Sequence, residues 1–184
     1  MCLFNVNQSK AQIIPKGVFL AKEFSKEIAL YHAKTFTMNE VLGQSPSLVK
    51  FEIYPLAAAN SGELTTLVYK CESKNKEGLI LGFYGLRWNE SGVQYQAYAF
   101  KNLPLNEANE LLDKIENITR ENYKYLDEDD DNNNIYFSFG DIKVLVYTTA
   151  IGTRLRIYWE GFDSEWEWST FLKTKKRLVK KLDK

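Results

Sequence analysis

The feature that most constrains the fold is a set of short segments in which apolar and polar residues alternate. In residues 48–54, Val49, Phe51 and Ile53 fall on one side and charged residues on the other, which is the pattern of a strand with one buried face. We expect Pro55 to end this strand. Comparable segments follow at 64–71, 79–88, 93–100, 134–139, 142–149 and 154–162. Short polar or glycine-bearing connections separate them, which favours an antiparallel sheet of about six to seven strands.

Three other segments have helical periodicity. Residues 18–36 and 105–117 place apolar residues on one helical face, and acidic residues follow Asn106 in the first turn of the second segment. The third begins at Ser164, where Glu167 stands three residues later as in a capping box. The sequence therefore predicts an α+β fold, with two or three helices packed against the antiparallel sheet.

The order of these elements is similar in two parts of the chain. Residues 64–117 read as three strands and a helix, and residues 134–182 read in the same way. We therefore expect one globular domain over 1–184, with a possible internal pseudo-repeat whose halves are joined by an acidic loop at 127–134. The alternative is that two unrelated meanders each precede a packing helix, which is common in α+β domains.

Charge and cysteine content narrow the class of protein. The 24 basic and 24 acidic residues give a net charge of zero. This excludes a uniformly basic nucleic-acid-binding protein, but it does not exclude local basic patches. Cys2 and Cys71 do not form the spaced set of a disulfide framework. No run of 18 apolar residues and no signal-like start is present. We expect a soluble, cytoplasmic protein that does not enter a membrane.

The usual catalytic residues are scarce. His32 is the one histidine and lies within a predicted helix, while Cys71 alternates within a predicted strand without a neighbouring base. Zinc-ligand spacings and phosphate-binding glycine loops are missing from the sequence. We therefore predict no catalytic residue, no metal ligand and no cofactor, and the sequence favours a protein that is not an enzyme.

One short motif supports a different hypothesis. Asp141-Ile142-Lys143 at the start of a predicted strand resembles the (D/E)-x-K element of the PD-(D/E)xK nuclease family. The resemblance implies carboxylates that hold a divalent cation and a lysine that positions the attacking water. It covers three residues, and the Pro-Asp element of the family has no counterpart. A metal-dependent hydrolase acting on nucleic acid or nucleotides is accordingly the alternative function.

Aromatic and arginine side chains provide the main candidate for binding. Alternation places Arg154, Arg156 and Tyr158 on one strand face, and Trp88 and Tyr95 lie in other predicted strands. Arginine and aromatic residues dominate protein-interface hot spots, and such a face could also stack single-stranded bases. The simpler interpretation is that these aromatics form cross-strand pairs.

The C-terminal helix is rich in basic residues, among them Lys176, Arg177 and Lys180. These could contact phosphates, which gives nucleic-acid binding as a second alternative, or they could form an ordinary solvated face. Our leading hypothesis is a non-catalytic binding protein of the adaptor, immunity or defence-accessory type. Its partner would be another protein, bound through the aromatic and arginine face and the charged patches.

Overall fold

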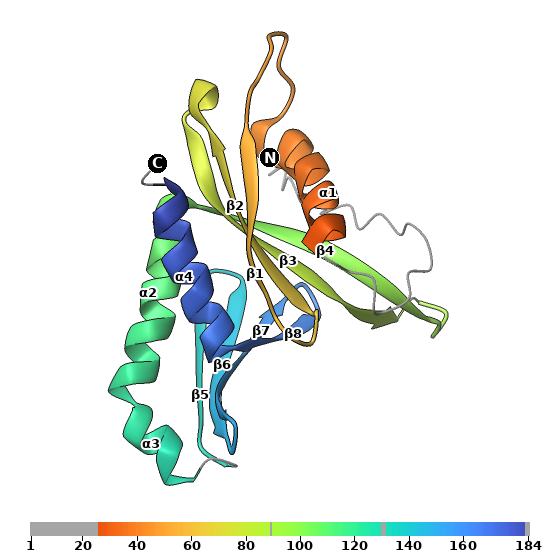
Figure 1. The fold of residues 1–184 in the computed structure, drawn as a ribbon. Coiled ribbons are helices and arrows are strands. Elements are labelled where there is room, and N and C mark those ends of the chain that lie inside the picture. The colour runs from red at the N-terminus through yellow and green to blue at the C-terminus, as the bar shows by residue number, and fades with distance from the viewer. Residues whose placement is uncertain (1–25, 89, 130–131, 183–184) are drawn as a thin grey trace, which may run out of the picture.

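Two antiparallel sheets form the framework of the molecule (Figure 1). The computed structural model describes residues 26–88, 90–129 and 132–182. The first sheet has the order β1-β2-β3-β4 and the second the order β5-β6-β7-β8. The strands are β1 (Glu52–Ala58), β2 (Leu64–Cys71), β3 (Lys76–Trp88), β4 (Gln94–Pro104), β5 (Asn134–Phe139), β6 (Ile142–Thr149), β7 (Gly152–Trp159) and β8 (Phe162–Glu167).

Helices cover both faces of the first sheet. They are α1 (Lys26–Phe36), α2 (Leu105–Glu121), α3 (Tyr123–Glu128) and α4 (Trp168–Leu182), with a π-helical turn η1 (Thr37–Leu42) after α1 and a short 3-10 turn η2 (Glu72–Lys74) after β2. Figure 1 shows α1 on one side of this sheet and α2 and α4 together on the other. Within the described ranges, no helix is long and apolar enough to cross a membrane.

The buried apolar residues form two clusters. The larger extends from the first sheet through α2 and α4 to the inner face of the second sheet, and includes Phe83, Ile115, Ile157 and Phe171. The smaller lies under α1 and η1 on the other face of the first sheet, around Leu67. Because one cluster touches both sheets, the two sheets share a hydrophobic core.

The predicted α+β class with antiparallel strands is confirmed, but the prediction of one sheet with six to seven strands is wrong. There are two sheets of four strands each. The chain leaves β4 through α2 and α3 before it reaches β5, so β4 and β5 never pair. Each sheet is a four-stranded meander followed by a helix.

The additional strand is β8, which the sequence analysis assigned to the last helix. Ser164 and Glu167 do not form a capping box, because both lie in β8 and α4 begins only at Trp168. Burial within β8 alternates: Ser164 and Trp166 are buried, whereas Asp163 is exposed. Pairing with β7 satisfies this alternation, and it overrides the local helix-start signal.

The first strand also differs from the prediction, because Pro55 lies inside β1. This strand is at the edge of its sheet and pairs only with β2. A proline that lacks an N–H is tolerated at an edge, and the register shifts between Pro55 and Ala57 as in a bulge. Elsewhere, α2 contains the predicted helix 105–117. Asp127 and Glu128 of the predicted acidic loop belong to α3. Residues 130–131 of that loop and 18–25 of the other predicted helix lie outside the described residues.

Candidate binding surfaces

The second sheet has one face that points away from the core. Strand register places Tyr136, Leu145, Arg156 and Glu165 in one row across the four strands. Opposed residues in an antiparallel sheet share a face. Neighbouring rows add the remaining side chains of what we call the outer face, namely Lys143, Tyr147, Arg154, Tyr158 and Asp163.

Both arginines of the outer face form ion pairs with β8. Arg156 Nε lies 2.6 Å from Asp163 Oδ1, and Arg154 Nε lies 3.5 Å from Glu165 Oε1. The hydrogen bond from Arg156 to Asp163 raises the pKa of the guanidinium. Burial and the nearby Glu165 raise the pKa of Tyr147, although hydrogen bonding to Arg156 acts in the opposite direction. These ion pairs therefore hold both arginines in place on the outer face.

The outer face is accessible to solvent. Tyr136 is 60% exposed, and the side chain of Arg156 retains 31% of its accessible surface. Helices α2, α3 and α4 approach the second sheet from the other side, where Ile115, Leu126 and Phe171 belong to the larger buried cluster. In the part of the chain that the structure describes, no helix covers the outer face.

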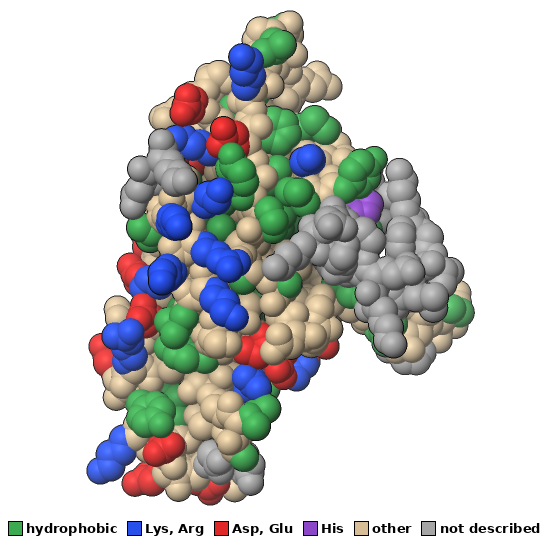
Figure 2. Space-filling view, viewed as in Figure 1, with side chains coloured by type: hydrophobic (Ala, Val, Ile, Leu, Met, Phe, Trp, Pro, Cys, Tyr) green, Lys and Arg blue, Asp and Glu red, His purple; other side chains and the backbone are tan. Residues whose placement is uncertain are grey.

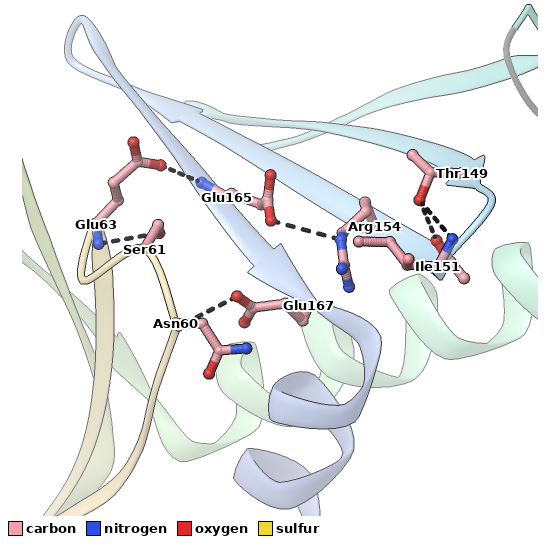
Figure 3. A network of polar contacts seen from close by, with 9 residues as sticks. Asn60, Ser61, Glu63, Thr149, Ile151, Arg154, Glu165 and Glu167 are labelled. Carbon is pink, nitrogen blue, oxygen red and sulfur yellow. Dashed lines mark hydrogen bonds and ion pairs between the residues drawn. The ribbon is translucent and has the colours of Figure 1, made fainter.

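The turn between β1 and β2 forms one border of this face (Figure 3). The Asn60 N–H donates to Glu167 Oε1 at 2.8 Å, and Glu63 Oε2 accepts from the Glu165 N–H at 2.9 Å. Glu167 is 3% exposed, and its Oε2 has no hydrogen-bond partner among the described residues. Because Glu167 directly precedes α4, its carboxylate also lies near the positive end of that helix dipole. This network fixes the first sheet to the edge of the second.

Trp88 and Tyr95 do not join the outer face. They lie in the β3–β4 hairpin of the first sheet, with Trp88 opposite Gln94 and Tyr95 opposite Arg87. Tyr95 packs partly buried against the larger cluster. Arg87 lies over the Phe162 ring at 4.8 Å. Trp88 and Tyr95 therefore belong to a different sheet from Arg154, Arg156 and Tyr158.

The basic residues of α4 form another exposed group (Figure 2). Lys176 and Lys180 are exposed, while Arg177 Nη1 donates to the Leu56 carbonyl of β1. By contrast, Lys175 forms ion pairs with Asp113 and Glu116 of α2. The charge of Lys175 is thus neutralised by α2, whereas Lys176 and Lys180 form no ion pair with the described residues.

Among the described residues, the side-chain partners of Asp141 are a lysine and a tryptophan. Asp141 lies in the β5–β6 turn, 2.8 Å from Lys101 Nζ, and accepts a 2.9 Å hydrogen bond from Trp159 Nε1. Partial burial opposes its ionisation, but the hydrogen bonds from Lys101 and Trp159 outweigh this and lower its pKa. Lys143 lies on the outer face opposite Tyr158. Among the described residues, no three His, Cys, Asp or Glu side chains are grouped closely enough to hold a metal.

A cavity of about 460 Å³ lies between η1, β2, β3, β4 and the start of α2. Tyr69, Lys76 and Asn102 contribute to its wall. Burial raises the pKa of Tyr69, and Asn102 Oδ1 is buried without a partner in the described ranges. The lining residues come from five separate elements, so no local sequence pattern indicates this cavity.

Asp163, Glu165 and Glu167, which lie beside the arginines on β8, were not among the predicted site residues. The alternation of apolar and polar residues within 162–167 would have indicated a strand. The capping-box interpretation assigned these residues to a helix instead. Comparison with known proteins adds no assignment: the chain matches no protein-family model, no curated protein and no solved structure.

Proposed function

We propose that the protein is a non-catalytic binding protein and that its outer face takes another protein. The observation that supports this most is the open sheet face that combines exposed Tyr136 with two arginines held by β8 carboxylates. Tyrosine and arginine are the residues enriched at interface hot spots. A cytoplasmic location belongs to the same proposal, because the two cysteines of the sequence are too few and too widely spaced for a disulfide framework.

The charges of the outer face favour a protein over a nucleic acid at this surface. Asp163 and Glu165 lie beside the two arginines, so their carboxylates would repel phosphates that approach the guanidinium groups. A protein partner can satisfy both signs, because its own surface offers donors, acceptors and apolar side chains together. The mixed charge therefore suits a protein interface.

The ion pairs also reduce what binding costs. An arginine side chain that is ordered only on association loses rotamer entropy, at roughly 0.5–1.5 kcal/mol per side chain. Arg156 is already fixed by its 2.6 Å contact with Asp163. Tyr136, Tyr147 and Tyr158 add ring area with few rotatable bonds. A partner would find this part of the surface preorganised.

Affinity capture with matched tyrosine variants tests the proposal. The test variant carries Tyr136→Ser and Tyr158→Ser on the outer face. The control carries Tyr123→Ser and Tyr125→Ser on α3, where both rings are also exposed. Proteins recovered from the protein's own source are quantified by mass spectrometry. We expect one stoichiometric partner that the wild type and the control retain and that the test variant loses by about tenfold or more.

Two results would contradict this proposal. If the same proteins were recovered with all three baits, or none above background, the outer face would not be a protein-binding surface. If the wild type hydrolysed nucleic acid or nucleotides with Mg²⁺ or Mn²⁺, and Asp141→Ala abolished that turnover, the hydrolase alternative would replace it.

A further inference from the structure

We propose that α4 carries a second binding surface, a basic stripe that takes the phosphate backbone of a single-stranded nucleic acid beside Tyr54. The basic stripe consists of Lys173, Lys176, Arg177, Lys180 and Lys181. It lies along α4 and adjoins β1, whereas the outer face belongs to the second sheet. The two surfaces can therefore be tested separately.

Ion pairing divides the basic residues of α4 into two groups. Lys175 is held by Asp113 at 2.6 Å and by Glu116. Lys173, Lys176 and Lys180 are exposed and have no carboxylate within 4.0 Å among the described residues. The stripe therefore keeps its positive charge, although the whole chain has a net charge of zero. Such local charge is what attracts a polyanion.

The spacing of the stripe suits a chain of phosphates. Lys173, Lys176 and Lys180 recur every three or four positions, so successive cations are about one helical turn, or 5.4 Å, apart along the axis. Figure 2 shows Lys and Arg side chains following one another along the surface over α4. A linear row of this kind can contact successive phosphates of one strand, and each contact releases condensed counterions.

Tyr54 adds an aromatic ring at one end of the stripe. Lys181 Nζ lies 3.9 Å from its ring centroid, and its hydroxyl donates to Glu52 at 3.0 Å. These contacts orient the ring, which remains 37% exposed. The five cations of the stripe outweigh the one Glu52 carboxylate, whereas each arginine of the outer face is paired with its own carboxylate. An exposed ring beside cations is the combination that stacks an unpaired base while the cations hold the backbone.

This combination favours a single strand over other polyanions. A duplex keeps its bases stacked internally and offers none to Tyr54. An anionic membrane would require a broad apolar face on α4, but the large apolar side chains exposed there, Leu172 and Val179, are interrupted by lysines. An acidic protein would use the cations without requiring the ring.

Fluorescence anisotropy with the full chain tests the inference. The probes are labelled oligo(dT) and oligo(rU) of about 12 nucleotides, within the usual site sizes of such proteins. If about four phosphates are neutralised, affinity should fall about 50-fold between 50 and 200 mM salt. The test variant, Lys176→Gln with Lys180→Gln, should show only about a sevenfold fall, because two contacts remain. Tyr54→Leu should weaken binding without changing the salt dependence.

The control variant changes the same charge elsewhere, with Lys34→Gln on α1 and Lys124→Gln on α3, both exposed in the wild type. It should bind like the wild type. The inference is overturned if neither probe binds at 50 mM salt, or if the control loses as much affinity as the test variant. Stronger binding to a matched duplex, to phosphatidylserine vesicles or to polyglutamate would overturn it in favour of that ligand. A preference between oligo(dT) and oligo(rU) would identify which strand is bound.

Discussion

Replacing Asp141 separates its structural role from the role that the nuclease motif would give it. In the structure its carboxylate joins Lys101 of β4 to Trp159 of β7. Asp141→Ala removes both contacts, whereas Asp141→Asn removes the charge but keeps an oxygen that can accept the Trp159 N–H. The difference in unfolding free energy between the two variants measures the contribution of the hydrogen bond from Trp159 Nε1.

The expected losses of stability follow from how exposed Asp141 and Trp159 are. The Lys101–Asp141 pair is partly solvated, since the aspartate side chain is 55% exposed, so its loss costs about 0–1 kcal/mol. Trp159 is 6% exposed, and an unpaired buried N–H costs about 1–3 kcal/mol. We expect Asp141→Asn to lower the free energy of unfolding by about 1 kcal/mol or less, and Asp141→Ala by about 2–3 kcal/mol.

Urea denaturation at pH 7 measures both values, and an unchanged m-value would show that the variants unfold like the wild type. The pH dependence provides a further check. Because the folded pKa of Asp141 lies below its ordinary value of 3.8, its contribution is present above that pH and is lost as the pH falls through the folded pKa. The difference in unfolding free energy between wild type and Asp141→Asn should therefore disappear as the pH falls below the folded pKa of Asp141. Equal destabilisation by Asn and Ala at pH 7 would refute the assigned role of the Trp159 hydrogen bond.

Three further substitutions test the core and the junction between the sheets, each measured by denaturant unfolding. Phe171→Ala empties a fully buried site in α4 and should cost about 3–5 kcal/mol; a cost below 1 kcal/mol would contradict the packing. Gly78→Ala would place Cβ 2.3 Å from the Leu103 carbonyl oxygen, so we expect a loss of about 1–3 kcal/mol or more, and a neutral result would contradict the β3–β4 register. Glu167→Ala leaves a backbone N–H of the β1–β2 turn without its acceptor and should cost about 1–3 kcal/mol. The exposed Glu110→Ala, which should change stability by less than about 0.5 kcal/mol, is its control.

The sequence predicted those elements whose periodicity is local. Helix α2 was identified because its apolar residues recur on one face and become buried there, as Leu111 and Ile115 show. Strands β5 and β6 likewise alternate between buried or half-buried and exposed positions. Their burial is decided by the spacing of neighbours in the chain, so the pattern is readable without a structure.

The errors arose where distant contacts decide the outcome. Residues 164–167 have a helix-start pattern, yet pairing with β7 makes them a strand. Pro55 is a strand breaker in general, but an edge position tolerates it. The division into two sheets likewise depends on which strands meet after α2 and α3, and no local pattern encodes that choice.

The charge pairs of the candidate surfaces also depend on contacts between residues that are distant in the sequence. Alternation correctly placed Arg154, Arg156 and Tyr158 on one face, but their partners Asp163 and Glu165 were assigned to a helix. The basic residues of α4 were counted together, whereas Lys175 is neutralised by α2. The acids that bind it are about 60 residues away in the sequence, so only folding distinguishes paired from unpaired charges.

The position of α4 has a consequence for folding during synthesis. This helix packs against β1 and β2 as well as β7 and β8, so its site on the first sheet stays open until residues 168–182 have left the ribosome. About 100 residues are translated after β2 is complete, which at roughly 5–20 residues per second leaves that apolar surface unprotected for about 5–20 s. A nascent chain of this kind is expected to need chaperone protection. Stalled chains ending at residue 167 should bind a hydrophobic dye strongly, and an absence of dye binding would show that the first sheet closes without α4.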